Sequence, residues 1–145
     1  MFKHLLIPTD GSELSNIAVI QGVRFAKEIG AKITGLTVTP PYHYVAIEGM
    51  QLADTRERYD RDIEQVAHHH LATLKQAAEQ VGVPCELVHA SSDHPYEEIV
   101  KTAEHQNCDV IFLASHGRRG MRAVIMGSET TKVLTHTKIP VVVYR

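Results

Sequence analysis

The stretch that decides the fold of this chain, residues 109–130, reads DVIFLASHGRRGMRAVIMGSET. It starts with a short apolar run at 110–114, which is typical of a buried strand in a parallel sheet. A loop with three glycines follows, and Ser128 stands where a helix is expected to begin. Glycines let the backbone approach a ligand, and the free N–H groups of a first helical turn attract negative charge. We therefore interpret the stretch as a loop that wraps the phosphates of a nucleotide.

The size and composition of the chain are those of one globular domain. It has 145 residues, 43% of them hydrophobic and 22% charged, and a formal net charge of −2. This near-neutral charge does not favour nucleic acid or an anionic membrane as a partner. No apolar run approaches the ~20 residues of a membrane span. Pro8 and Asp10 come too early for a signal peptide. We expect one cytoplasmic domain spanning residues 1–145.

Hydrophobic periodicity predicts strands and helices in strict alternation. Strands are expected at 3–9, 31–39, 84–90, 110–114 and 139–144, and helices at 13–29, 51–81, 93–106 and 128–137. Ser12 and Asp93 are expected to cap the first and third helices, with Pro95 in the first turn of the third. Gly30 and Gly82 should end the first two helices. Such alternation predicts a parallel sheet with helices on both faces. The segment 40–50 is interpreted as a packed apolar loop or, alternatively, as a lid.

The long helix expected at 51–81 carries one apolar seam and a run of three histidines. The seam consists of Leu52, Tyr59, Ile63, Val66, His70, Leu74, Ala77 and Val81. His68, His69 and His70 cannot converge on one ion, because consecutive helical residues point about 100° apart. The pattern places His70 on the buried seam and the other two in solvent. Zinc shared between two chains stays an alternative.

Familiar catalytic signatures are missing from the sequence. It has no P-loop, no G-x-G-x-x-G after the first strand and no G-x-S-x-G elbow. No pair of base and nucleophile is evident either. His116 could orient a water molecule, or it could simply form hydrogen bonds within the loop. We expect no rapid enzyme, and at most slow hydrolysis of a bound nucleotide.

Both ends of the chain resemble the universal stress protein family. The sequence reads IPTDGS at 7–12, SHGRRG at 115–120, MGS at 126–128 and IPVVV at 139–143. The nucleotide-binding branch of that family has the signature Gly, two residues, Gly, nine residues, Gly and then Ser or Thr. This chain keeps the second half of that signature, and the resemblance covers its whole length.

One position departs from the signature. Gly117, nine residues and then Gly127–Ser128 fit the spacing, but Ala114 replaces the first glycine. If position 114 needs a positive φ, alanine costs about 1–2 kcal/mol. If the backbone must only approach the ligand closely, the methyl group could push the ligand away. In ordinary strand geometry alanine costs almost nothing.

The resemblance implies an α/β fold with an open, five-stranded parallel sheet in the order 3-2-1-4-5. Helices would cover both faces, as in Rossmann-like proteins and the adenine-nucleotide alpha hydrolases. The order reverses between the first and fourth strands, so a crevice opens at their carboxyl ends. Residues 8–10 and 114–117 would meet there. Cys85 and Cys108, interpreted as buried thiols, would lie roughly 14 Å apart, too far for a disulfide.

The resemblance also implies a site for ATP, usually together with a divalent ion such as Mg²⁺. Asp10 would accept hydrogen bonds from the ribose or base, and Val38 would pack on the adenine. Backbone N–H groups and the Ser128 hydroxyl would surround the phosphates, where the Glu129 carboxylate is repulsive unless a metal ion intervenes. The implied nucleotide-binding residues are Pro8, Thr9, Asp10, Val38, Leu113, Ala114, His116, Gly117, Arg118, Arg119, Gly127, Ser128 and Glu129.

The last strand raises the question of partners. Residues 139–144 are apolar and would lie at an edge of the sheet, which should be paired or covered. Related proteins pair this strand with its twofold mate, so the resemblance implies a homodimer through 141–144. The leading hypothesis is a stress-response dimer that signals its nucleotide occupancy to an unknown partner. The alternatives are a scaffold dimer of the same fold without nucleotide and a flavodoxin-like flavin carrier.

Overall fold

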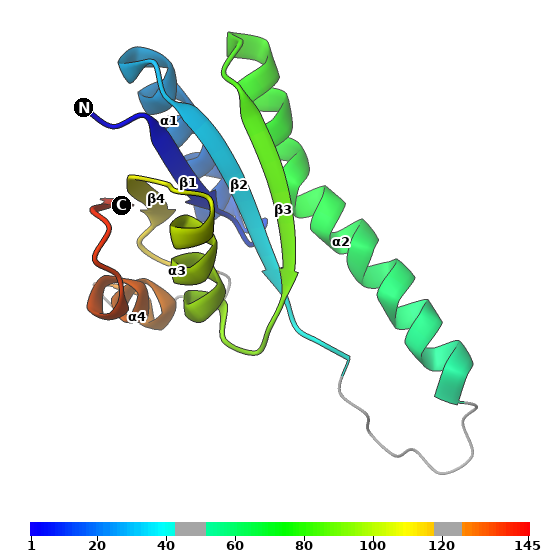
Figure 1. Ribbon diagram of the computed structural model, residues 1–145. Coiled ribbons are helices and arrows are strands. Elements are labelled where there is room, and N and C mark those ends of the chain that lie inside the picture. Colours follow the sequence, from blue (N-terminus) through cyan, green and yellow to red (C-terminus); the bar gives the residue numbers. More distant parts are fainter. Residues whose placement is uncertain (43–51, 118–125) are drawn as a thin grey trace.

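The structure, a computed structural model, describes residues 1–42, 52–117 and 126–145, with residues 52–55 described by their backbone alone. Its strands form one five-stranded sheet in the order β3-β2-β1-β4-β5, as predicted. Figure 1 labels β3, β2, β1 and β4 of this sheet. The strands are β1 (His4–Pro8), β2 (Lys32–Thr39), β3 (Cys85–Ser91), β4 (Val110–Ala114) and β5 (Val141–Tyr144). The helices are α1 (Glu13–Ile29), α2 (Leu52–Val81), α3 (Pro95–His105) and α4 (Ser128–His136). All strand pairs are parallel.

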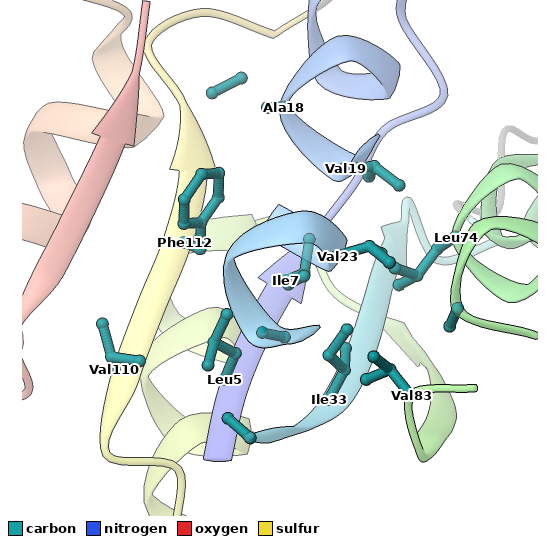
Figure 2. Packing of buried hydrophobic residues seen from close by; sticks show 14 residues of the cluster. Leu5, Ile7, Ala18, Val19, Val23, Ile33, Leu74, Val83, Val110 and Phe112 are labelled. Carbon is teal, nitrogen blue, oxygen red and sulfur yellow. The ribbon is translucent and has the colours of Figure 1, made fainter. Parts of the chain in front are cut away.

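The three central strands β2, β1 and β4 are buried on both faces, as expected for parallel strands, whereas the edge strands β3 and β5 are half-buried or exposed. Successive side chains of a strand point to opposite faces, so Leu5 and Ile7 enter one core cluster and Leu6 enters the other. Figure 2 shows the first cluster, which α1 and α2 cover and which includes Val23, Leu74 and Phe112. The second cluster lies under α3 and α4. It includes Leu36, Ile99, Ile111, Leu113 and Val133.

The predicted ends of α1 are confirmed. The Ser12 Oγ accepts a hydrogen bond from the N–H of Ser15 at 3.3 Å, which makes Ser12 the N-cap. Gly30 ends the helix at φ = 67°, in the left-handed region that glycine adopts without a steric cost. The short loop between Ser12 and β1 is therefore held at a helix start.

The predicted cap of α3 is wrong. His94, and not Asp93, is the N-cap, because Pro95 occupies the first helical position and the residue before it takes the capping role. The His94 side chain makes no capping hydrogen bond. The acceptor comes from another helix instead: Glu129 Oε2 accepts the N–H of Tyr96 at 3.0 Å.

The predicted seam of α2 is only partly correct. His70 and Leu74 are buried, but Val66 and Val81 are 38% and 36% exposed. The remaining buried contacts are made by Ala67, Leu71 and Ala78. Small alanine side chains let the helix approach the sheet closely. The buried face of α2 is therefore rotated slightly from the predicted seam, which runs through the larger apolar residues.

Two further expectations concern the cysteines and the segment at 40–50. Cys85 and Cys108 are free thiols; Cys108 is buried as expected, but Cys85 is only half-buried. Burial raises the pKa of each thiol to about 11. Cys85 begins β3 and Cys108 precedes β4, and β2 and β1 lie between these two strands, in keeping with the predicted order. Most of 40–50 lies outside the described residues, so its role as loop or lid stays a prediction. None of the helices in the described part of the chain is long and apolar enough to cross a membrane.

Candidate functional site

The turns after β1 and β4 meet at the end of the sheet where the strands have their carboxyl termini. β1 and β4 pair in parallel, with Leu5 opposite Val110 and Leu6 opposite Ile111, so both strands end at the same edge. β1 also pairs with β2, and the sheet order therefore reverses between β1 and β4. At this edge a methyl group on Gly117 would lie only 2.6 Å from Asp10 Oδ2. The Asp10 carboxylate thus lies against the backbone of the glycine loop.

The turn after β1 is fixed by its own hydroxyl and carboxylate groups. The Thr9 Oγ1 is buried and accepts hydrogen bonds from Ser15 Oγ at 2.9 Å and from the N–H of Gly11 at 3.2 Å. Asp10 Oδ1 accepts the N–H of Ser12 at 3.0 Å. Thr9 therefore holds the turn, and the other carboxylate oxygen of Asp10 faces Gly117.

A buried histidine supports this turn from α2. Gly11 adopts φ = +74°, and a methyl group there would collide with the ring of His70. The Nδ1 atom of His70 lies 3.2 Å from Thr37 Oγ1. His68 and His69 are exposed, as predicted. Within residues 1–42, 56–117 and 126–145, no three His, Cys, Asp or Glu side chains gather into a group that could hold a metal ion.

The start of α4 is clamped onto the end of β4. The N–H of Gly127 donates to the carbonyl of Ser115 at 2.7 Å. The Thr130 hydroxyl donates to the carbonyls of Ala114 and Ser115, at 3.0 and 3.2 Å. A methyl group on Gly127 would lie 3.0 Å from the Ser115 carbonyl oxygen, so a glycine suits this contact. The helix begins at Ser128, as predicted, and Gly127 is its N-cap.

The first turn of α4 presents backbone donors. The N–H groups of Ser128, Glu129 and Thr130 precede the first intrahelical hydrogen bond, which Thr131 donates to Gly127 at 3.0 Å. No described residue accepts a hydrogen bond from these three groups. Free N–H groups and the positive end of the helix dipole together favour an anion.

The replacement of glycine by Ala114 leaves the strand unstrained. Ala114 lies in β4 opposite Tyr144, and among the described non-glycine residues only Asn107 has a positive φ. The Ala114 side chain belongs to the core cluster under α1. The observed geometry is that of an ordinary strand, which excludes a positive φ at this position.

His116 lies beside the N-cap of α4. Its Nδ1 atom is 3.0 Å from Ser115 Oγ, and its Cδ2 atom would lie 3.8 Å from a methyl group on Gly127. Its Nε2 atom is buried and has no hydrogen-bond partner in the part of the chain that the structure describes. Buried polar atoms are normally paired, so this nitrogen is a candidate contact for a ligand.

The other predicted residues lie at the rims of the site or beyond the described ranges. Pro8 ends β1, half-buried. Val38 is half-buried near the end of β2, and Leu113 is buried in β4; both pack in the cluster under α3 and α4. Arg118 and Arg119 lie outside the described residues. The carboxylate of Glu129 points toward α3, while its N–H stays in the first turn of α4.

The sequence pattern does not predict the supporting roles of two residues, Thr130 and His70. Thr130 joins α4 to β4, and its position two residues after the Gly127–Ser128 motif was the available signal. The helical pattern places His70 on the buried seam, but its contact with Gly11 joins segments that are far apart in the chain. No local pattern reports such a contact.

The chain is similar over its whole length to known proteins. The family model described as the universal stress protein family matches residues 1–145. Universal stress protein YxiE of Bacillus subtilis is 28% identical, and the alignment covers 100% of both chains. Universal stress protein MJ0577 of Methanocaldococcus jannaschii is 27% identical, over 100% of this chain and 96% of that protein. A solved structure of MJ0577 superposes with a TM-score of 0.82, covering 99% of this chain and 95% of that one.

Several more distant structures share the fold and hold adenine nucleotides. A universal stress protein in complex with cAMP is 18% identical, with a TM-score of 0.70. A family protein from Arabidopsis thaliana with AMP bound is 16% identical (TM-score 0.65), and one from Archaeoglobus fulgidus in complex with dAMP is 13% identical (TM-score 0.62). They cover 97–100% of this chain. The full-length family match, the sheet order and the two converging turns lead to one conclusion: the chain belongs to the universal stress protein family.

Proposed function

We propose that the protein binds an adenine nucleotide, with ATP as the expected ligand, in the crevice between the ends of β1 and β4. The observation that carries the proposal is the first turn of α4, whose N–H groups meet no acceptor among the described residues and which Gly127 and Thr130 hold beside the loop that faces Asp10. The adenine nucleotides in the related structures support the choice of ligand class.

The residues of the crevice fit a nucleotide. Gly117 lets the Asp10 carboxylate lie against the loop, and Gly127 lets the start of α4 lie against the Ser115 carbonyl, so both glycines bring the two turns and the helix N-terminus together. The first-turn N–H groups of α4 and the Ser128 hydroxyl would contact that phosphate. Asp10 would accept hydrogen bonds from ribose hydroxyls, and Val38 would border the adenine. A bound Mg²⁺ ion would supply neutralisation of phosphate charge.

The proposed role is regulation in the cytoplasm rather than catalysis. Binding shifts a protein toward the conformations that bind the ligand better, so occupancy can be signalled to a partner without turnover. The proposed dimer forms through β5, which is an edge strand of four half-buried residues. Hydrolysis, if present, would be slow.

A thermal melt with and without Mg-ATP tests the proposal. A ligand at a hundredfold over its Kd stabilises the native state by about 2.7 kcal/mol. A domain of this size gains roughly 2–4 °C in Tm per kcal/mol, so we expect a rise of several degrees. GTP at the same concentration controls for adenine recognition. A flat response to ATP, AMP and cAMP at millimolar concentration would favour the scaffold dimer instead.

A further inference from the structure

Glu129 brings a negative charge to the turn that is proposed to bind phosphate. It is the second residue of α4, directly after Ser128. Its Oε1 atom lies 3.1 Å from Lys132 Nζ, and its Oε2 atom accepts the N–H of Tyr96 at 3.0 Å. The side chain is 42% exposed. A carboxylate in a first turn is favourable by itself, because it faces the positive end of the helix dipole. With a phosphate at the same helix end, two anions share that dipole.

The bond to Tyr96 holds this charge in place. Tyr96 is the second residue of α3, and the N-cap of α3, His94, offers no side-chain acceptor. Glu129 therefore caps α3 from the neighbouring helix. If the carboxylate moved away from an incoming phosphate, it would leave the Tyr96 N–H without its acceptor. The bond to Tyr96 therefore opposes a movement of the Glu129 carboxylate away from the phosphate.

We propose that Glu129 determines the phosphate specificity of the site, by disfavouring ligands in proportion to their negative charge. This inference rests on the proposed nucleotide site. The protein then binds AMP, or ATP neutralised by a divalent cation, in preference to free ATP. Coulomb repulsion grows with the product of the charges, so a triphosphate loses more affinity than a monophosphate. Lys132 opposes the effect, because its ammonium group offsets part of the carboxylate charge.

The test is Glu129→Gln, with affinities for AMP and ATP measured by calorimetry in EDTA and again in excess Mg²⁺. Glutamine removes the charge but keeps an oxygen that can accept the Tyr96 N–H. We expect free ATP to bind about three- to tenfold more tightly to the variant, with a much smaller change for AMP. Mg²⁺ should reduce the difference between the variant and the wild type.

Glu98→Gln is the matched control. Glu98 lies in the first turn of α3 and pairs with Lys101 three residues later at 3.5 Å, as Glu129 pairs with Lys132. It has no described bond to α4, so its removal should leave the ratio of ATP to AMP affinity unchanged. Lys132→Met should shift the ratio in the opposite direction to Glu129→Gln. This arm keeps the test decisive if Glu129→Gln folds poorly.

The outcomes separate the inference from the proposed function. Wild-type protein that binds no adenine nucleotide in either buffer overturns both. Suppose the wild type binds, and Glu129→Gln and Lys132→Met both keep its ratio of ATP to AMP affinity. That result overturns the role of Glu129 but leaves the proposed nucleotide binding standing. Weaker binding of free ATP by Glu129→Gln would show that the carboxylate assists the triphosphate and would also overturn it.

Discussion

Gly117 and Ala114 lie only three residues apart, but a side chain at the first position would point toward Asp10 and the side chain at the second points into the core. A side chain on Gly117 would meet the carboxylate of Asp10, whereas the side chain of Ala114 packs in the core under α1. The alanine that replaces the first glycine of the family signature therefore packs its methyl group in the core. At the scale of single residues, the direction of a side chain matters more than its match to a motif.

Exchanging the two residue types tests this difference. Ala114→Gly should lower the Tm slightly, because glycine in a strand costs roughly 0.5–1 kcal/mol, and should leave the nucleotide Kd unchanged. Gly117→Ala should displace Asp10 and weaken nucleotide binding about tenfold or more, which corresponds to 1.4 kcal/mol. Calorimetric titration with Mg-ATP measures both. Tighter binding by Ala114→Gly would mean that the methyl group hinders the ligand after all.

At the scale of elements, α4 is a short helix that serves two neighbours. Its first turn is tied to β4 through Thr130 and to α3 through Glu129. Its N–H donors are therefore held relative to the sheet, and the cap of α3 depends on the same turn. If α4 moved on ligand binding, the hydrogen bond from Tyr96 to Glu129 would change and α3 would be displaced or lose its cap. The proposed signal could reach the surface of the protein in this way.

A proline at the start of α4 tests the backbone donors. Ser128→Pro removes one N–H at the first helical position, where proline is tolerated, and Gly127 before it is already extended at φ −67° and ψ 154°. We expect the fold to persist and the Mg-ATP shift in Tm to shrink markedly. Ser128→Ala, which removes only the hydroxyl, is the control and should keep more of the shift. Equal shifts in both variants would exclude a role for this N–H.

At the scale of the whole molecule, the two edges of the sheet differ. β3 and β5 are the edge strands, and all four residues of β5 are half-buried. Ile111 and Ser115 donate to the carbonyls of Pro140 and Tyr144, so Val141 and Val143 turn their backbone groups away from β4. This outward row of donors and acceptors is what the proposed dimer would pair.

Val143→Pro should therefore abolish the dimer and leave the protomer folded. The change removes an outward N–H, and proline is tolerated in an edge strand on its unpaired side. Sedimentation of wild type and variant at micromolar concentration gives the mass of each, and circular dichroism checks the fold. Wild-type protein that sediments as a monomer would contradict the proposed dimer.

The features that the amino-acid sequence determined by itself depend on interactions between residues close together in the chain. Alternating strand and helix patterns, the caps at Ser12 and Gly30, and the glycine spacing before Ser128 depend on neighbouring residues, so they predicted the elements and, with the family resemblance, the sheet order. Tertiary structure alone decided the rest. The support of Gly11 by His70 and the capping of α3 by Glu129 join segments that are distant in the chain. Such contacts depend on how packed helices and strands are placed, and periodicity along the chain carries no record of that placement.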